Sequence, residues 1–495
     1  MNGGGRAKPG FWLPLLAIAL AAAAAPAVAQ TEPLVRSDRS AATGQGPVTV
    51  TTEMGLVAIE SAPGVRDATA GYLSYSLADA PSERPVLFIF NGGPGASASY
   101  LHMGALGPVR ARVPQDPRAP LPDAAAIETD PQTLLDLADL VFIDPPGTGF
   151  SERAPDADAG FYNSVAGDAD AAAQLVAQWL DAHGRATAPV FLLGESYGTI
   201  RAVAMLDALA ERRPELRVEG VVLLGQALNM IETSQRPDNI LSYVVSLPSL
   251  AAIACYHGKA VQPCEPDAIS RTAARFAGTE YLRALFQGSA IAADEKRRVA
   301  ERLEQLSGIS ADYYLANDLR ISKERFRVEL LRDEGLVVGR YDARYVAPRP
   351  ADAGAVVGPD AFSAVSALYE GAMRAYLARD LGLADADAYK VIAIPEGSWA
   401  YGGGDTPFAD WPFMESVERA MAREPALRLF VGTGIFDLTT TIGAADYLIA
   451  QSSIAPDRYR LERYPAGHVA YSDDASWRKL VGDLRSFLTA AAPHD

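Results

Sequence analysis

Val190-Phe-Leu-Leu-Gly-Glu-Ser-Tyr-Gly-Thr199 is an apolar run that breaks into a Gly-x-Ser-x-Gly turn, and a helical pattern follows over residues 200–210. The apolar residues before the turn predict a fully buried strand. A strand-to-helix turn of this kind is so tight that Gly194 and Gly198 must be small, and it exposes the hydroxyl of Ser196 at the helix N-terminus. The helix dipole favours developing negative charge there. We predict that Ser196 is a nucleophile; the alternative is an ordinary turn with a helix-capping serine.

Two more strands that are apolar throughout end in rigid loops of glycine and proline. Residues 85–90 run into Asn91-Gly-Gly-Pro-Gly95, and residues 137–143 run into Asp144-Pro-Pro-Gly-Thr-Gly-Phe-Ser151. Strands without polar alternation are covered on both faces, as in the middle of a parallel sheet. The loop at 91–95 is either a plain turn or a row of bare backbone N–H groups offered to an oxyanion.

These strands alternate with helical segments, and further buried strands are expected at residues 218–224, 427–431 and 460–464. This order predicts the α/β class with a doubly wound, mostly parallel sheet. Residues 48–53, 55–60 and 71–77 alternate apolar with polar or small residues. We therefore expect half-buried antiparallel strands at one edge of the sheet.

Residues 1–29 have the pattern of a signal peptide. Arg6 and Lys8 precede an apolar run over residues 11–25, and Ala27-Val-Ala29 has the form of a cleavage site. We expect a secreted or periplasmic protein that has no stable membrane association after cleavage. The alternative is an uncleaved anchor, although the alanine-rich run is barely long enough to span a bilayer.

The rest of the chain divides by its patterns. Residues 30–46 are small and polar and predict a linker, and residues 47–229 are expected to form the first part of the α/β core. Helical and loop patterns over residues 230–395 predict an inserted helical cap, or alternatively an independent second domain. Strand patterns of the core type resume afterwards, so residues 396–495 are assigned to the second part of the core.

Charge and cysteine content exclude several classes of protein. The net charge is −17, and this argues against a nucleic-acid partner, which requires clustered Lys and Arg. Cys255 and Cys264 are the only cysteines, and in an oxidising compartment we expect them to form a disulfide. A metal site would need more ligands nearby than His257 alone, so we predict no metal and no cofactor. The oligomeric state is open.

A nucleophilic serine needs a general base and a carboxylate that orients the base. Asp437 follows the strand expected at 427–431, and His468 follows the strand expected at 460–464. Of the five histidines, His468 alone lies on a loop directly after a late strand, because His494 lies at the C-terminal end of the chain. We therefore predict a triad of Ser196, Asp437 and His468, with a helix N-cap as the alternative role for Asp437.

Taken together, these motifs resemble the serine carboxypeptidase family of α/β hydrolases over about residues 50–230 and 425–490. The motifs are Asn91-Gly-Gly-Pro-Gly95, Asp144-Pro-Pro-Gly-Thr-Gly-Phe-Ser151, Gly194-Glu-Ser-Tyr-Gly198, Asp437 and Gly467-His468. The resemblance implies an α/β-hydrolase core, the same triad, and peptide substrates with a free C-terminus. It also implies an oxyanion hole formed by the backbone N–H groups of Gly93 and Tyr197. Asn91, Gly92 and Glu195 would bind the C-terminal carboxylate of the peptide.

Glu195 has a physical reason to lie beside the nucleophile. One carboxylate binds another only when one of them carries a proton, so such a pair predicts a preference for acidic pH. The alternative is a structural hydrogen bond at the turn. The family usually has a second Glu in this network, and the matching residue here is Ala105. Ala96 stands where the family has a Cys, and Val469 stands where a Met is common.

The sequence thus predicts an exported serine carboxypeptidase. The loss at Ala105 keeps open an esterase or acyltransferase that uses the same triad. A binding protein on an inactive hydrolase scaffold is a third possibility, and the filled triad positions argue against it.

Overall fold

The computed structural model describes residues 1, 33–351, 354, 360–402 and 413–490. Apart from Met1, the expected signal peptide lies outside the described residues. Across these ranges, no helix has both the length and the apolar character that a membrane span requires.

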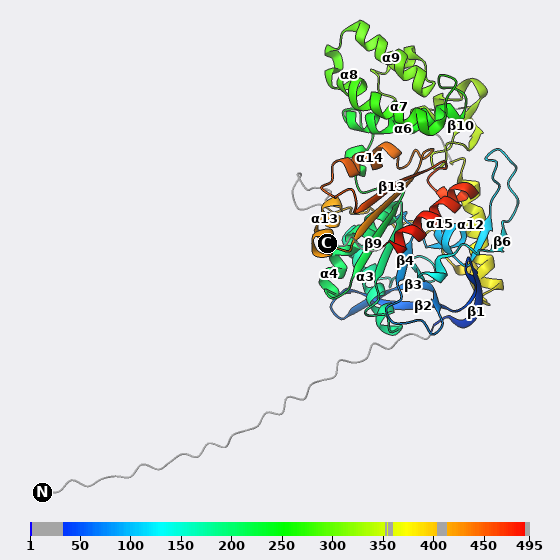
Figure 1. Cartoon of the computed structure of the whole chain (residues 1–495), viewed down its shortest axis with the longest axis vertical. Coiled ribbons are helices and arrows are strands. Elements are labelled where there is room, and N and C mark those ends of the chain that lie inside the picture. The colour runs from blue at the N-terminus through cyan, green and yellow to red at the C-terminus, as the bar shows by residue number, and fades with distance from the viewer. Residues whose placement is uncertain (2–32, 352–353, 355–359, 403–412, 491–495) are drawn as a thin grey trace. The chain divides into compact units, whose positions relative to one another are not determined.

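A nine-stranded sheet forms the centre of the fold, in the order β1-β2-β3-β7-β4-β8-β9-β12-β13 (Figure 1). The first three strands pair antiparallel, and the strands from β7 to β13 pair parallel. The expected α/β fold with a mostly parallel sheet and an antiparallel edge is confirmed. The strands are β1 Val35–Thr43, β2 Gly46–Ala62, β3 Val65–Leu77, β4 Val86–Phe90, β7 Asp139–Asp144, β8 Val190–Glu195, β9 Val218–Leu224, β12 Arg428–Gly434 and β13 Tyr459–Tyr464.

The linker predicted for residues 30–46 is wrong over most of its length. Residues 35–43 form β1, which pairs along its whole length with β2. Its side chains are alternately half-buried and exposed up to Ala41, as suits a strand at the edge of a sheet. Backbone hydrogen bonds to β2 rather than an apolar face hold this strand, so its polar composition gave no periodic signal.

Helices cover both faces of the sheet, and side chains alternate between two buried clusters. In β4, Val86, Phe88 and Phe90 join one cluster, whereas Leu87 and Ile89 join the other. The helices of the first cluster are α3 Val165–Ala182, α4 Tyr197–Arg212, α13 Phe413–Arg423 and α14 Ile442–Ala450. Those of the second are α1 Ser99–Leu101, a π-helical turn over His102–Leu106, α12 Ser363–Arg379 and α15 Asp474–Thr489.

A third cluster consists of residues between β9 and β12 together with four residues after β12: Ile435, Phe436, Leu438 and Ile442. Figure 1 shows its helices grouped next to α14, with which α6 makes contact. They are α6 Ile240–Tyr256, α7 Pro266–Phe276, α8 Leu282–Gln287, α9 Ala293–Ser307, α10 Ala311–Ala316 and α11 Lys323–Glu329. A disulfide joins Cys255 at the end of α6 to Cys264 before α7. The limits of the cap at 230 and 395 stay a prediction. Within these limits, α12 belongs to the second cluster together with strands of the sheet, and not to the third cluster.

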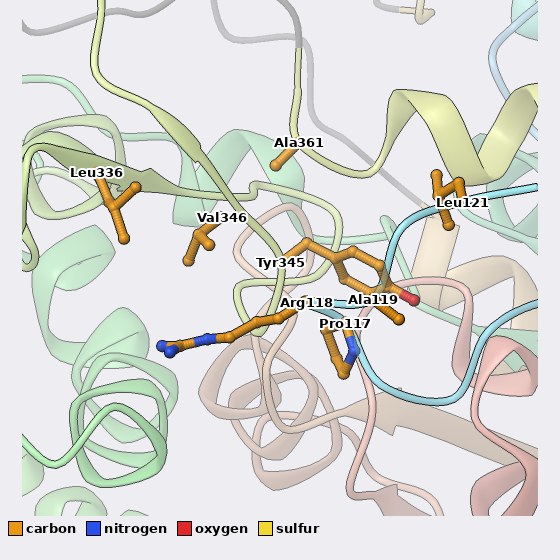
Figure 2. A pocket seen from close by; sticks show the side chains of 8 residues that line it. All are labelled: Pro117, Arg118, Ala119, Leu121, Leu336, Tyr345, Val346 and Ala361. Atoms are coloured by element: carbon orange, nitrogen blue, oxygen red, sulfur yellow. The ribbon is translucent and has the colours of Figure 1, made fainter.

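A small hairpin precedes α12. Its strands are β10 Leu336–Val338 and β11 Val346–Pro348. A cavity of about 340 Å³ lies between this hairpin and residues 117–121 (Figure 2). The shorter elements of the chain are β5 Val109–Arg112, β6 Ala126–Thr129, α2 Ala159–Tyr162 and α5 Met230–Thr233.

A buried ion pair links the helices α3 and α4. Arg201 of α4 donates to both carboxylate oxygens of Asp168 in α3, at 2.8 and 3.1 Å, and to the carbonyl of Asn91 at 2.8 Å. The side chain of Arg201 is 0% exposed, and that of Asp168 is 5% exposed. Removing one partner would leave the other charge buried without compensation.

We therefore expect Asp168→Ala to lower the free energy of unfolding by about 3–5 kcal/mol in urea titration. Glu215→Ala is the matched control, because Glu215 pairs with Arg213 at the surface, where its side chain is 61% exposed. That change should leave the unfolding midpoint almost where it was. Equal losses in both variants would contradict the importance of the buried pair.

Candidate active site

Ser196 sits in a strained turn between β8 and α4. Its backbone has φ 58° and ψ −126°, in the left-handed half of conformational space that residues other than glycine rarely adopt. A Cβ at Gly194 would lie 2.0 Å from the carbonyl oxygen of Gly198, and a Cβ at Gly198 would lie 2.8 Å from that of Asn91. The steric reason for the two glycines is therefore confirmed.

Asp437 and His468 meet at the same edge of the sheet. Asp437 follows β12 and His468 follows β13, and His468 Nδ1 lies 2.7 Å from Asp437 Oδ2. Because an ionised carboxylate only accepts hydrogen bonds, the imidazole donates through Nδ1. Its other nitrogen, Nε2, is buried and has no hydrogen-bond partner among the described residues. The imidazole is thus held in place through Nδ1, and Nε2 is available for a further hydrogen bond.

The pKa of His468 reflects its surroundings. Burial lowers this pKa, but the negative charge and hydrogen bond of Asp437, together with the charge of Glu195, more than offset that effect and raise it above its usual value. Asp437 is itself held by the backbone N–H groups of Thr439 and Thr440, at 2.6 and 3.0 Å, and by the Thr440 hydroxyl at 2.7 Å. Neither threonine was singled out in the sequence.

The end of β9 connects the serine to the histidine. The N–H of Ser196 donates to the carbonyl of Leu224 at 2.8 Å. The next residue, Gly225, has φ 56°, and a Cβ there would lie 2.8 Å from Cε1 of His468. The structure thus brings Ser196 and His468 to one short segment of backbone. The general-base role of His468 stays a prediction.

The glycine loop after β4 packs against the start of α4. A Cβ at Gly92 would lie 2.6 Å from the backbone nitrogen of Tyr197 and 2.9 Å from Cβ of Ser196. Gly93, the next residue, has φ 106°. Only glycine allows the loop to approach the serine this closely. The arrangement suits an oxyanion site made by Gly93 and Tyr197, which remains to be tested.

Glu195 is buried beside Ser196 and makes two hydrogen bonds through one oxygen. Asn91 Nδ2 donates to its Oε2 at 2.5 Å, and the Tyr471 hydroxyl donates to the same oxygen at 3.1 Å. Its other oxygen, Oε1, is buried and has no partner in the described part of the chain. Burial raises the pKa of Glu195 to about 7, against the lowering effects of the His468 charge and the two donors. Asn91 and Glu195, both predicted for carboxylate binding, are therefore in contact.

Several residues of the site were not singled out in the sequence. Tyr471 follows His468 by three positions but lies 276 positions from Glu195. Lys323, the first residue of α11, donates to the carbonyl of Thr439 at 3.0 Å. Burial lowers the pKa of Lys323, and the charge of Asp437 partly offsets this. Each of these contacts joins segments that are distant in the chain.

The segment between β10 and β11 holds the loop that carries His468. Asp342 Oδ2 accepts from the N–H of Gly467 at 3.1 Å and from Arg344 at 2.7 Å. The N–H of His468 donates to the carbonyl of Tyr341, and the ring of Tyr341 lies 5.5 Å from the imidazole. Nothing in the spacing of these residues predicted that they meet His468.

The serine carboxypeptidase family model matches residues 44–229. The resemblance to serine carboxypeptidases is confirmed. A search of curated proteins finds no match.

One solved structure supports the α/β-hydrolase fold of this chain. Kex1 from Saccharomyces cerevisiae, a prohormone-processing carboxypeptidase, is 13% identical, with a TM-score of 0.52 over 88% of this chain and 91% of that chain. At this identity the likeness shows the shared α/β-hydrolase fold. Proline iminopeptidase from Mycobacterium smegmatis is 12% identical, with a TM-score of 0.33 over 91% of this chain and 97% of that chain. An epoxide hydrolase from Aspergillus niger is 13% identical, with a TM-score of 0.36 over 88% of this chain and 78% of that chain.

Gly225 tests whether the position of His468 matters for activity. In Gly225→Ala the new methyl group would push against the imidazole, and a shift of about 1 Å can lower kcat roughly 100-fold. Gly288→Ala is the matched control, because Gly288 has φ 57° but no atom within 4 Å of an added Cβ. It therefore carries the same backbone strain without the collision. We expect steady-state kinetics to show a loss of kcat in Gly225→Ala alone; a comparable loss in both would assign the effect to strain.

Proposed function

We propose that this protein is an exported serine carboxypeptidase that removes C-terminal residues from peptides through an acyl-enzyme on Ser196. The observation that carries the proposal is Glu195. A buried carboxyl directly beside the nucleophile, with one oxygen unpartnered among the described residues, suits recognition of a terminal carboxylate. Export rests on the leader pattern of residues 1–29.

In the proposed mechanism, His468 accepts the proton of the Ser196 hydroxyl as the serine oxygen attacks the last peptide carbonyl. Asp437 holds the imidazole and stabilises the positive charge that forms on it. The N–H groups of Gly93 and Tyr197 would stabilise the oxyanion of the tetrahedral intermediate. His468 then gives the proton to the leaving amino group, and the C–N bond breaks. Water, deprotonated by His468, hydrolyses the acyl-enzyme in the second half of the reaction.

Substrate recognition depends on the protonation state of Glu195. At a pH below its pKa of about 7, Glu195 is neutral and can donate a proton to a substrate carboxylate. Above that pH both groups are negative and repel each other. Asn91 holds Glu195 from one side, and Gly92 lets the loop lie against Ser196 and Tyr197 because it has no side chain.

The nucleophile is tested by Ser196→Ala. Members of a triad act as a unit, so kcat should fall by at least about 10⁴-fold. Alanine fits the turn, and the melting temperature should change little. A fluorophosphonate probe should label the unchanged protein on the peptide that contains Ser196 and should not label the variant. Labelling that persists in Ser196→Ala would assign the nucleophile to another residue.

The pH dependence tests the role of Glu195. For an N-blocked dipeptide with a free C-terminus, kcat/KM should fall as pH rises through about 7, where Glu195 loses its proton. The C-terminally amidated dipeptide has no negative charge, so its kcat/KM should instead rise with pH as His468 becomes neutral. Glu195→Gln keeps a donor and removes the ionisation, so the fall for the free acid should disappear.

Esters provide the control for this test. Ester turnover needs the triad but no terminal carboxylate, so Glu195→Gln should leave it largely intact. If the free acid and the amide have the same pH profile in the unchanged protein, and esters are the better substrates, then the esterase alternative replaces the carboxypeptidase.

A further inference from the structure

The two oxygens of Glu195 have different surroundings, and this defines where its acidic proton lies. Oε2 accepts from both Asn91 Nδ2 and the Tyr471 hydroxyl. A carboxyl oxygen that accepts two donors acts as the carbonyl oxygen of the neutral acid. The proton of the neutral acid therefore belongs on Oε1, the buried oxygen without a partner among the described residues.

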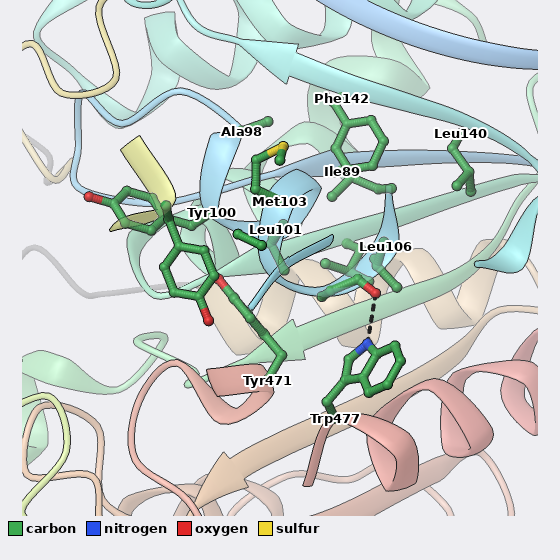
Figure 3. Close-up of a cluster of buried hydrophobic side chains, with 14 of the residues drawn as sticks. Ile89, Ala98, Tyr100, Leu101, Met103, Leu106, Leu140, Phe142, Tyr471 and Trp477 are labelled. Atoms are coloured by element: carbon green, nitrogen blue, oxygen red, sulfur yellow. Dashed lines mark hydrogen bonds between the residues drawn. The ribbon is translucent and has the colours of Figure 1, made fainter. Parts of the chain in front are cut away.

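Tyr471 is rigidly placed for this contact. Its ring is 0% exposed and lies against Gly104, where an added Cβ would come within 2.4 Å of the ring. Figure 3 shows Tyr471 near the segment that carries Leu101 and Met103. The backbone of Tyr471 is also fixed, because Arg110 donates to its carbonyl at 2.7 Å.

We propose that Tyr471 is a positioning residue, which holds Glu195 so that the Oε1 hydroxyl points to the C-terminal carboxylate of a peptide substrate. The inference rests on the proposed carboxypeptidase function and adds to it a second donor to Glu195. Position 105, on the same π-helical turn as Gly104, has only a methyl side chain, and its carbonyl accepts from Trp477 (Figure 3). An alanine side chain supplies no hydrogen bond, and Asn91 and Tyr471 are the donors to Glu195 among the described residues.

The groups around Glu195 are compatible with a hydrogen bond from the Tyr471 hydroxyl to Glu195. His468 lowers the pKa of Glu195, whereas Asp437 raises it. Burial raises the pKa of the Tyr341, Tyr369 and Tyr471 phenols above their usual value, and the charge of Glu195 raises each further. The phenols are therefore neutral, and Tyr471 remains a donor whether Glu195 is protonated or ionised.

The Tyr471 hydroxyl stabilises ionised Glu195 more than neutral Glu195, because a charged acceptor forms the stronger hydrogen bond. In Tyr471→Phe the pKa of Glu195 should rise, and the fall of kcat/KM for the free-acid dipeptide should move up by about one pH unit. Because the acid also loses an anchor, KM for that substrate should rise roughly tenfold at low pH. The amidated dipeptide has no terminal carboxylate, so its KM should rise less than that of the free acid.

Tyr369→Phe is the matched control for packing. The Tyr369 ring lies 6.2 Å from that of Tyr471, and its buried hydroxyl has no hydrogen-bond partner among the described residues. This change removes a hydroxyl from the same aromatic cluster without removing a bond to Glu195. It should not move the pH profile. A shift equal to that of Tyr471→Phe would overturn the proposal.

The outcomes separate this inference from the proposed function. If the unchanged protein distinguishes the free acid from the amide but Tyr471→Phe has the same pH profile, the carboxypeptidase proposal stands and the role of Tyr471 is overturned. If the unchanged protein does not distinguish the two substrates, both are overturned. Should Tyr471→Phe fail to fold, a fluorinated tyrosine at position 471 keeps the ring and strengthens the donor. The profile should then shift toward lower pH, and an unchanged profile would count against the proposal.

Discussion

The close approach of backbone to backbone at the Ser196 turn constrains the rest of the structure. Gly194 and Gly198 touch without room for a side chain, and Gly198 also touches the carbonyl of Asn91. The strand, the helix and the glycine loop after β4 must therefore meet at one point. The buried pair of Arg201 and Asp168 reinforces that meeting, since Arg201 also binds the carbonyl of Asn91.

Burial gives the two titratable groups near Ser196 opposite tendencies, and their partners decide the outcome. Glu195 has only neutral donors as direct partners, so its pKa rises to about 7. His468 has the ionised Asp437 as its partner, so its pKa also rises in spite of its burial. A neutral acid and a polarised imidazole can thus coexist in one site. In water, neither burial nor a fixed partner would shift the pKa of either group.

The site also depends on the part of the chain between β9 and β12. Asp342 and Tyr341 support the His468 loop through its backbone, and Lys323 binds the backbone of the loop that carries Asp437. A change in the packing of this region would therefore reach the site through hydrogen bonds to loop backbone. In an open α/β sheet, such loops collect at the carboxyl ends of the strands, which is where these supports attach.

Local patterns in the sequence were sufficient for the α/β fold, the parallel strands and the resemblance to serine carboxypeptidases. Each rests on residues close together in the chain, such as the buried run into Gly194 or the loop at 91–95. The same patterns failed for β1, whose backbone pairing leaves no apolar periodicity. Tyr471, Thr440 and Asp342 were not predicted because their roles are defined by what they touch. Only the folded chain brings the Tyr471 hydroxyl to Glu195, because that contact depends on the packing of a ring against Gly104 rather than on any spacing along the sequence.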